Sequence, residues 1–562
     1  MKRFITLLLA AISLLTLSLM PISCGPAGTE QNGTQPNVTT AAPQDTECVH
    51  QYTAVETPAT YTEKGFTTHT CEKCGDTYVD SYVDALASVI LQYDDYVTTL
   101  GNIQATSTTA TISGDSLEVI TKDGTTYFHA KNVGVVTVTD GDKTETVAID
   151  KARLHLVVVM GQSNAGCHFA NAMSDVACDI GTAYWWPTYT SNKVVDYTRT
   201  STGFHAPLVA ELRAQSVAAG SPEKPVLIWL EGATSKDGQA ITAWAASATD
   251  TSGTDTTVKM IEDCIKYYTA AERADKYEIV ESGVYWLQGE GGSYGDPAIY
   301  VDRFMAMWNR LKDAGMNYLA FLRVRKGVSF NSTVTDHNDL MHHGALRAQM
   351  EMINENDDMY LASTITENWI GQVNDKHSIN ISNYITMMEA YGKSENYSDK
   401  LGNKATFKDG ILTTTMKELY GENNKCHYGK FGYGIIGADA AYNMYRALHK
   451  DEFAIVYTDT SGMVDKQVTS KAGETVQLDI TGMTEMLTFR PACYSTAGTL
   501  EITVKKGNTT ITNVSGVLSK AENTYMAIST EKIRTYDDVT ITVTYTTTDG
   551  ESGSVVYEIV NN

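Results

Sequence analysis

Basic residues are scarce in this chain of 562 residues, which has 43 Lys and Arg against 67 Asp and Glu. The formal net charge is −24, and no cluster of basic residues stands out along the sequence. Because binding to a phosphate backbone depends on clustered Lys and Arg, we do not expect a nucleic acid as a partner. An acidic surface also repels polyanionic substrates.

Cysteines and long apolar runs are scarce too. Nine cysteines in a chain of this size are too few for a scaffold held together by disulfides. After the first 23 residues, no stretch is long and apolar enough to span a bilayer. The length is too great for a single hydrophobic core, so three or more domains are expected.

The chain opens with basic residues and an apolar run, which predicts a secretory signal peptide over residues 1–23. A small residue before Cys24 resembles a bacterial lipoprotein cleavage site, with the lipid on Cys24, although Pro21 fits that pattern poorly. Ordinary secretion is the alternative. Either route predicts an extracellular or cell-surface bacterial protein, in contact with a membrane only through a lipid anchor. Residues 24–47, rich in Pro, Gly, Thr, Asn and Gln, are predicted to be a flexible linker.

Three thiols and one imidazole gather in the next segment, residues 48–87. Two closely spaced pairs of ligands are typical of a four-coordinate structural zinc site. About 40 residues hold too little apolar surface to fold alone, so a small zinc-ribbon-like module is predicted. A disulfide or free thiols are the alternatives, and the role is structural in each case. The candidate ligands are Cys48, His50, Cys71 and Cys74.

Two segments have the alternating pattern of β-strands. Residues 88–150 contain Asp140-Gly141 between two alternating runs, a strong hairpin signal, and are predicted to be a bacterial immunoglobulin-like β-sandwich. Residues 451–562 alternate in the same way and predict a second β-sandwich. The first is expected to be a spacer, and the second either a spacer or a glycan-binding domain.

Between them, residues 151–450 alternate predicted strands with predicted helices. The run Leu154–Met160 is apolar and β-branched throughout, as in a strand buried on both faces of a parallel sheet. The pattern predicts a doubly wound, three-layer α/β/α sandwich of flavodoxin-like type. Residues 364–410 do not fit the alternation and are expected to form an insertion over one face. Further strands are predicted at 226–230, 278–287, 319–324 and 359–363, and helices at 254–275, 297–315, 339–354 and 431–449.

Side chains with catalytic potential follow the strands of this segment. They are Ser163, Glu290 and His427, in the order of hydrolases on doubly wound sheets. A serine hydroxyl needs a base to take its proton, histidine is the usual base, and a carboxylate stabilises the imidazolium. The amide of Gln288 can donate to a developing oxyanion. Each of these residues taken alone often has a structural role, such as helix capping or ion pairing. The prediction of a catalytic site therefore rests on their combination.

The motifs Gly161-Gln162-Ser163-Asn164 and Gln288-Gly289-Glu290, with Gly432-Tyr433 and Gly437 after His427, resemble the SGNH-hydrolase superfamily. The similar branch comprises the sialate O-acetylesterases and carbohydrate esterase family six, the acetylxylan esterases. The resemblance covers roughly residues 154–450. It implies removal of acetyl groups from acetylxylan or acetylated sialic acids, without a catalytic metal or cofactor.

By this resemblance Ser163 is the nucleophile and His427 the base. The family often has Asp three residues before the histidine, where this chain has Asn424. Asparagine orients an imidazole but cannot offset its charge. Either the activity is reduced or another carboxylate serves. The resemblance favours Glu290 as that acid, since the family also uses this Glu near the histidine, and Glu422 is a distant third choice.

The oxyanion donors would be the Ser163 backbone N–H, the Gln288 side chain and a backbone N–H near Gly203. The neighbouring Gln162 and Asn164 are assigned to substrate binding.

The sequence thus predicts an exported serine esterase whose partner is an O-acetylated poly- or oligosaccharide, and it leaves the oligomeric state open. A weak or inactive carbohydrate-binding surface protein on the same scaffold is the alternative, kept open by Asn424. A lipase or thioesterase of the superfamily is a third reading, which no apolar lid segment supports.

Overall fold

The computed structural model falls into two compact units, residues 1–57 with 66–81, and residues 58–65 with 82–562. They are described separately. The predicted signal peptide, linker and lipidation site at Cys24 lie outside the described residues. The structure describes residues 49–57, 64–83, 89–166, 176, 183–187, 192–196, 203–289, 296–323, 344–369, 374–392, 395–398, 402, 404–420, 427–449, 454–459, 464–483 and 486–560.

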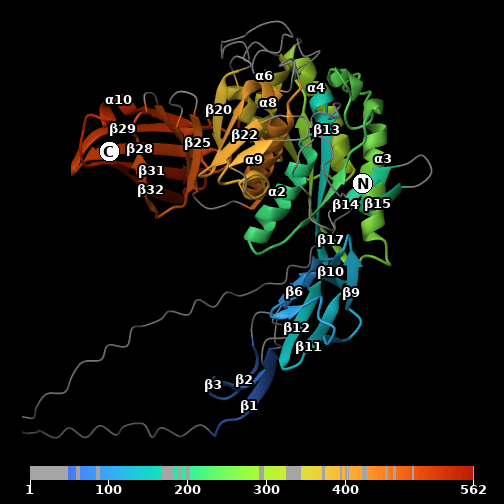
Figure 1. Cartoon of the computed structure of the whole chain (residues 1–562). Helices are drawn as coiled ribbons and strands as arrows, with labels where there is room; N and C mark the ends of the chain where they lie inside the picture. The colour runs from blue at the N-terminus through green and yellow to red at the C-terminus, as the bar shows by residue number, and fades with distance from the viewer. Residues whose placement is uncertain are drawn as a thin grey trace, which may run out of the picture. The chain divides into compact units, whose positions relative to one another are not determined.

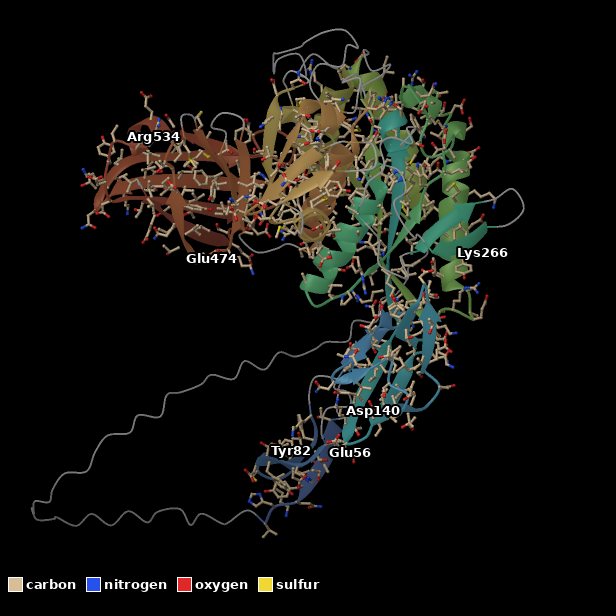
Figure 2. The ribbon with its side chains drawn as sticks, in the orientation of Figure 1. Glu56, Tyr82, Asp140, Lys266, Glu474 and Arg534 are labelled. Carbon is tan, nitrogen blue, oxygen red and sulfur yellow. The ribbon has the colours of Figure 1, made fainter. Side chains whose placement is uncertain are left out.

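A three-stranded sheet, β1-β2-β3, forms the smaller unit. Its strands are β1 (Tyr52–Thr57), β2 (Gly65–Cys71) and β3 (Thr77–Val83). Glu56 on β1 and Tyr82 on β3 are labelled in Figure 2. Among the described residues of these strands, only Gly65 and Cys71 are buried. The sheet has almost no hydrophobic core of its own, as its composition predicts.

Two small sheets pack as a β-sandwich over residues 89–150. Their orders are β5-β10-β9 and β4-β12-β11-β8, around a core that includes Phe128 and Val147. The predicted Asp140-Gly141 hairpin joins β11 to β12 and is confirmed. The bounds are β4 (Val89–Gln92), β5 (Tyr96–Val97), β6 (Thr99–Leu100), β7 (Ile103–Gln104), β8 (Thr111–Ser113), β9 (Leu117–Lys122), β10 (Thr125–Ala130), β11 (Gly134–Asp140) and β12 (Lys143–Asp150).

The main sheet has seven strands in the order β15-β14-β16-β13-β17-β18-β19. All neighbours run parallel except β14 and β15, so the predicted alternation of strands and helices is confirmed. The order reverses direction at β13, and ligands of open α/β sheets bind at the carboxyl ends of strands at such a point. The strands are β13 (Ala152–Gly161), β14 (Ala183–Pro187), β15 (Asn192–Asp196), β16 (Lys224–Ile228), β17 (Tyr277–Leu287), β18 (Tyr318–Leu322) and β19 (Met359–Ser363).

Helices cover both faces of this sheet (Figure 1). Alternate residues of β13 belong to two different cores. Val157 and Val159 belong to one core with α2 (His205–Ala218) and α9 (Lys430–His449). Leu156 and Val158 belong to the other core. That core also contains side chains of α3 (Asp255–Thr269), α4 (Pro297–Asp313) and α6 (Gly344–Glu355). A strand covered on both sides must be apolar on both sides, which explains its unbroken hydrophobic run.

Local rules account for the predicted helices. On α3, Ile261 and Tyr268 are buried while Lys266 is exposed on the opposite face (Figure 2). At the start of α4 the carboxylate of Asp296 accepts the Ala298 N–H at 2.9 Å, and Pro occupies the first turn. Helix α3 ends at Thr269, six residues before the predicted end, because a run of turns follows.

The segment 364–410, expected to be an insertion over one face, adds an antiparallel sheet beside α9. Its strand β20 pairs in parallel with β25 (Val464–Ser470), so this sheet runs across the domain boundary expected at 450/451. Ile379 and Leu412 join the core formed by α2 and α9, which makes the segment a cover over that face. The elements are η3 (Ile365–Asn368), β20 (Lys376–Asn380), α7 (Ile385–Tyr391), β21 (Asn396–Ser398), β22 (Lys404–Lys408), β23 (Ile411–Thr415) and α8 (Met416–Tyr420).

The carboxyl-terminal region is a second β-sandwich, on which Figure 2 labels Glu474 and Arg534. Its sheets have the orders β21-β22-β23-β20-β25-β24-β27-β30 and β26-β32-β31-β28-β29. The predicted alternation is confirmed, since Leu500, Ile502 and Val504 are all buried. The elements are β24 (Ile455–Asp459), β26 (Thr475–Asp479), β27 (Met486–Pro491), β28 (Gly498–Lys506), β29 (Thr509–Leu518), β30 (Met526–Ser529), α10 (Thr530–Ile533), β31 (Val539–Thr547) and β32 (Ser552–Val560).

Within the described part of the chain, no helix has the length and hydrophobicity needed to cross a membrane.

Candidate functional sites

The turn after β13 places Ser163 at the carboxyl edge of the main sheet. Gly161 has φ 138°, and a Cβ there would lie 2.1 Å from the carbonyl oxygen of Leu287, so only glycine fits. The Gln162 N–H donates to that same carbonyl at 3.1 Å. Since Gln288 follows Leu287, two of the sequence-predicted motifs lie side by side.

Ser163 begins the short helix α1 (Ser163–Gly166) and is partly exposed, whereas Gln162 and Asn164 on either side are buried. The partly exposed serine therefore stands between two buried residues of the turn. A nucleophile held in one place needs less reorganisation to reach a bound carbonyl.

His205, which sequence reasoning missed, contacts this turn through its ring. Its Nε2 lies 3.0 Å from the carbonyl oxygen of Ala165, and its ring packs on Trp229. Complete burial lowers the pKa of His205 to about 4, so the ring is neutral at pH 7 and donates its one N–H to the carbonyl. Gly203 is buried with φ 68° and starts the turn that leads into α2.

Gln288 is fully buried, and hydrogen bonds fix its amide. Its Oε1 accepts the Tyr300 hydroxyl at 2.8 Å, and its Nε2 donates to the Gln239 carbonyl at 3.4 Å. Gln349 holds the Gln288 backbone carbonyl at 2.9 Å. With its oxygen anchored on Tyr300, the amide keeps one orientation, which an oxyanion donor requires.

The loop after β16, residues 231–236, also frames the serine turn. The Gly161 N–H donates to Thr234 O at 3.1 Å, and the Lys236 N–H donates to Gly161 O at 2.9 Å. Sequence reasoning predicted the strand but not the role of its loop. The position of this loop after a predicted strand could have indicated that role, because loops at the carboxyl ends of adjacent parallel strands meet at one edge.

His427 is partly exposed and lies three residues before α9. The ring of the next residue, Tyr428, packs on Tyr433 with centroids 5.6 Å apart. The Tyr433 hydroxyl donates to Asn164 Oδ1 at 2.7 Å. A single hydrogen bond thus ties the start of α9 to the neighbour of Ser163, although 269 residues separate the two partners.

The glycines of the last motif let α9 approach its neighbours. A Cβ on Gly432 would lie 2.2 Å from Leu419 O, and one on Gly437 would lie 2.5 Å from Phe204 O. Both contacts are with backbone atoms, which cannot move aside cheaply. These two positions therefore require glycine for packing.

Glu290, Asn424 and Glu422 lie outside the described residues. The choice among them as partner of His427 stays a prediction.

Three of the four predicted metal ligands lie together in the smaller unit. The ligand atoms of His50, Cys71 and Cys74 are all within 4.8 Å of one another, and Cys48 lies outside the described residues. Among the described residues, no disulfide joins Cys71, Cys74, Cys264 and Cys493. Burial raises the pKa of Cys71, but backbone N–H groups of Cys74, Gln51 and Lys73 donate to its sulfur and lower the pKa to about 5.

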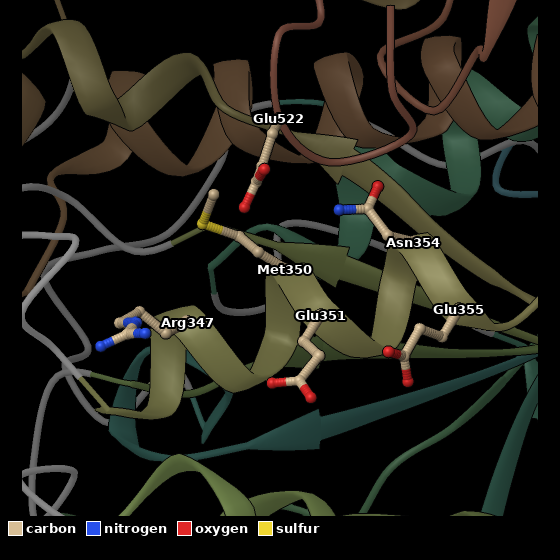
Figure 3. A pocket seen from close by; sticks show the side chains of 6 residues that line it. All are labelled: Arg347, Met350, Glu351, Asn354, Glu355 and Glu522. Carbon is tan, nitrogen blue, oxygen red and sulfur yellow. The ribbon is translucent and has the colours of Figure 1, made fainter.

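A cavity of about 320 Å³ lies over α6, and none of the predicted site residues lines it (Figure 3). Asn354, in its wall, accepts the Ala521 N–H at 3.1 Å, which joins α6 to the carboxyl-terminal sandwich. Three carboxylates and one guanidinium give the cavity an acidic lining. The residues are Arg347, Met350, Glu351, Asn354, Glu355 and Glu522.

Comparison with protein-family models and with curated proteins finds no match to this chain.

Proposed function

We propose that this chain is an exported serine esterase on an SGNH-hydrolase fold, removing O-acetyl groups from carbohydrates. The hydrogen bond from Tyr433 to Asn164 carries the proposal, because it joins the His427 segment to the Ser163 turn. The contact of that turn with the strand before Gln288 adds the third motif. These contacts link segments of three motifs that lie far apart in sequence, which supports the proposal.

The proposed reaction has two steps. His427 takes the Ser163 proton as the oxygen attacks the acetyl carbonyl, and the sugar leaves as an alcohol with the proton from His427. Water then attacks acetyl-Ser163 by the same route and releases acetate. The oxyanion donors would be the N–H of Ser163, the amide of Gln288 and an N–H near Gly203. This chemistry uses no metal or cofactor.

Glu290 is proposed as the charge partner of His427, with Asn424 as an orienting group. A carboxylate stabilises the imidazolium formed in both steps, which a neutral amide cannot do. The proposed substrate is an O-acetylated poly- or oligosaccharide, either acetylxylan or O-acetylated sialoglycan. The proposed location is outside the cell or on its surface, through the leader and a lipid on Cys24.

Acetyl release from p-nitrophenyl acetate tests the assignment. Ser163→Ala should lower the rate by several orders of magnitude, as removal of a nucleophile does. Ser247→Ala, which changes a partly exposed serine between β16 and α3, should leave it unchanged. A Ser163→Ala variant that keeps wild-type activity would refute the nucleophile.

Assays of the wild-type chain with glycans distinguish an esterase from the carbohydrate-binding alternative. Acetate release from acetylated xylan or from O-acetylated sialoglycan identifies the substrate class. Binding to these glycans without any acetate release would favour the carbohydrate-binding alternative.

A further inference from the structure

The sheet of the smaller unit brings two thiols and an imidazole together from separate strands. His50 lies two residues before β1, while Cys71 ends β2 and Cys74 occupies the turn that follows. Their ligand atoms lie within 4.8 Å of one another, and Cys74 Sγ is 3.3 Å from His50 Nδ1. Chain segments 20 residues apart converge on one point.

These separations fit a tetrahedral metal site. Zn–S bonds near 2.3 Å and Zn–N bonds near 2.0 Å place neighbouring ligand atoms about 3.5–3.8 Å apart. The turn is closed by Gly75 N–H to Cys71 O at 2.9 Å and by Cys71 N–H to Asp76 O at 2.8 Å. Gly75 has φ 76°, which glycine adopts without strain.

The imidazole is held with Nδ1 toward the sulfurs. The Tyr52 ring stacks on His50 with centroids 5.3 Å apart, and the Tyr52 hydroxyl donates to Asp76 at 2.7 Å. Asp76 in turn lies 3.9 Å from His50 Nδ1. The stacked Tyr52 ring limits the orientation of the imidazole.

We propose that the smaller unit binds one zinc ion through His50 Nδ1, Cys71 Sγ and Cys74 Sγ. Cys48, the fourth ligand that the sequence predicts, lies outside the described residues. Zinc replaces the thiol protons, which pass to solvent, so binding involves no change of oxidation state. The bound ion would cross-link the residues before β1 to the turn between β2 and β3, which would stabilise a sheet that has almost no core.

Elemental analysis of the full-length chain, loaded with zinc under reducing conditions, tests the proposal. We expect about one zinc per chain. His50→Ala and Cys74→Ser should each weaken zinc binding by at least about tenfold, since even outer neighbours of a metal contribute that much. Cobalt in place of zinc should give the absorption of a tetrahedral thiolate complex, which both variants lose.

His69→Ala is the matched control. His69 belongs to the same sheet, stacks on Tyr78 and pairs with Asp80 at 2.8 Å, as His50 stacks on Tyr52 near Asp76. It lies outside the thiol cluster, so its loss should leave zinc content and the cobalt spectrum unchanged. Absence of zinc, a disulfide at Cys71 or Cys74 in the chain as purified without reductant, or an equal loss in His69→Ala would overturn the proposal.

Discussion

At the scale of single residues, the identity of the acid decides how strongly His427 is activated. Glu290→Gln keeps the shape but removes the charge, so kcat should fall by roughly 10²- to 10⁴-fold with KM little changed. Asn424→Ala should cost much less, because a neutral amide supplies orientation only. Asn424→Asp should be tolerated or mildly activating.

Steady-state kinetics of these three variants measure the difference. A severe Asn424→Ala with a mild Glu290→Gln would show a Ser-His-Asn arrangement. It would leave Glu290 as a structural residue of the turn after β17.

Sequence reasoning identified residues whose chemistry is recognisable and missed those that support them. Ser163 and Gln288 were found because their types suit the reaction and they follow apolar strands. His205 was missed because a histidine at the start of a helix has no distinctive pattern. Its role depends on one contact, with Ala165 O, between residues 40 positions apart.

At the scale of elements, the hydrogen bond between α9 and α1 gives the most direct test of the proposed site. Tyr433→Phe removes the donor and leaves the buried Asn164 Oδ1 without it, at a cost of about 1–3 kcal/mol. If this contact positions the Ser163 turn relative to His427, kcat should fall about tenfold or more while KM changes little.

Tyr442→Phe supplies the comparison for this prediction. It lies on the same helix, and its hydroxyl makes a hydrogen bond of the same 2.7 Å length, to Thr469. That bond leads away from the serine turn. Equal kcat values for the two variants, measured with matched folding controls, would show that the Tyr433 contact serves stability only.

Element prediction succeeded where periodicity was strong. Strand β19 matches its predicted bounds, and the predicted helix 431–449 begins one residue earlier as α9. Helix α2 was missed because the main sheet and α9 bury it around most of its circumference, which leaves no single apolar stripe. The pairing of β20 with β25 was also missed, because partners 86 residues apart leave no local pattern.

At the scale of the whole molecule, the periodicity of apolar residues predicted the mixed architecture of α/β and β-sandwich parts, but not how firmly neighbouring parts are joined. Lys224, at the start of β16, is buried and lies 3.0 Å from Asp95 of the first sandwich. Its Nζ also donates to the Tyr93 carbonyl at 2.7 Å. Burial lowers the pKa of Lys224, and the nearby Asp95 carboxylate opposes that shift.

Two truncations should therefore behave differently. A chain beginning at residue 88 loses the proposed zinc site but keeps Asp95, so esterase activity and thermal stability of the main sheet should be unchanged. A chain beginning at residue 151 loses both Asp95 and Tyr93, the partners of Lys224, so its main sheet should unfold at a lower denaturant concentration. Asp95→Asn in the full-length chain breaks the ion pair while Lys224 stays buried, which should cost about 3 kcal/mol, the lower end of the range for a broken buried pair. Denaturant unfolding followed alongside acetate release measures both effects. Activity that disappears already in the chain beginning at residue 88 would instead give the amino-terminal unit a direct part in catalysis.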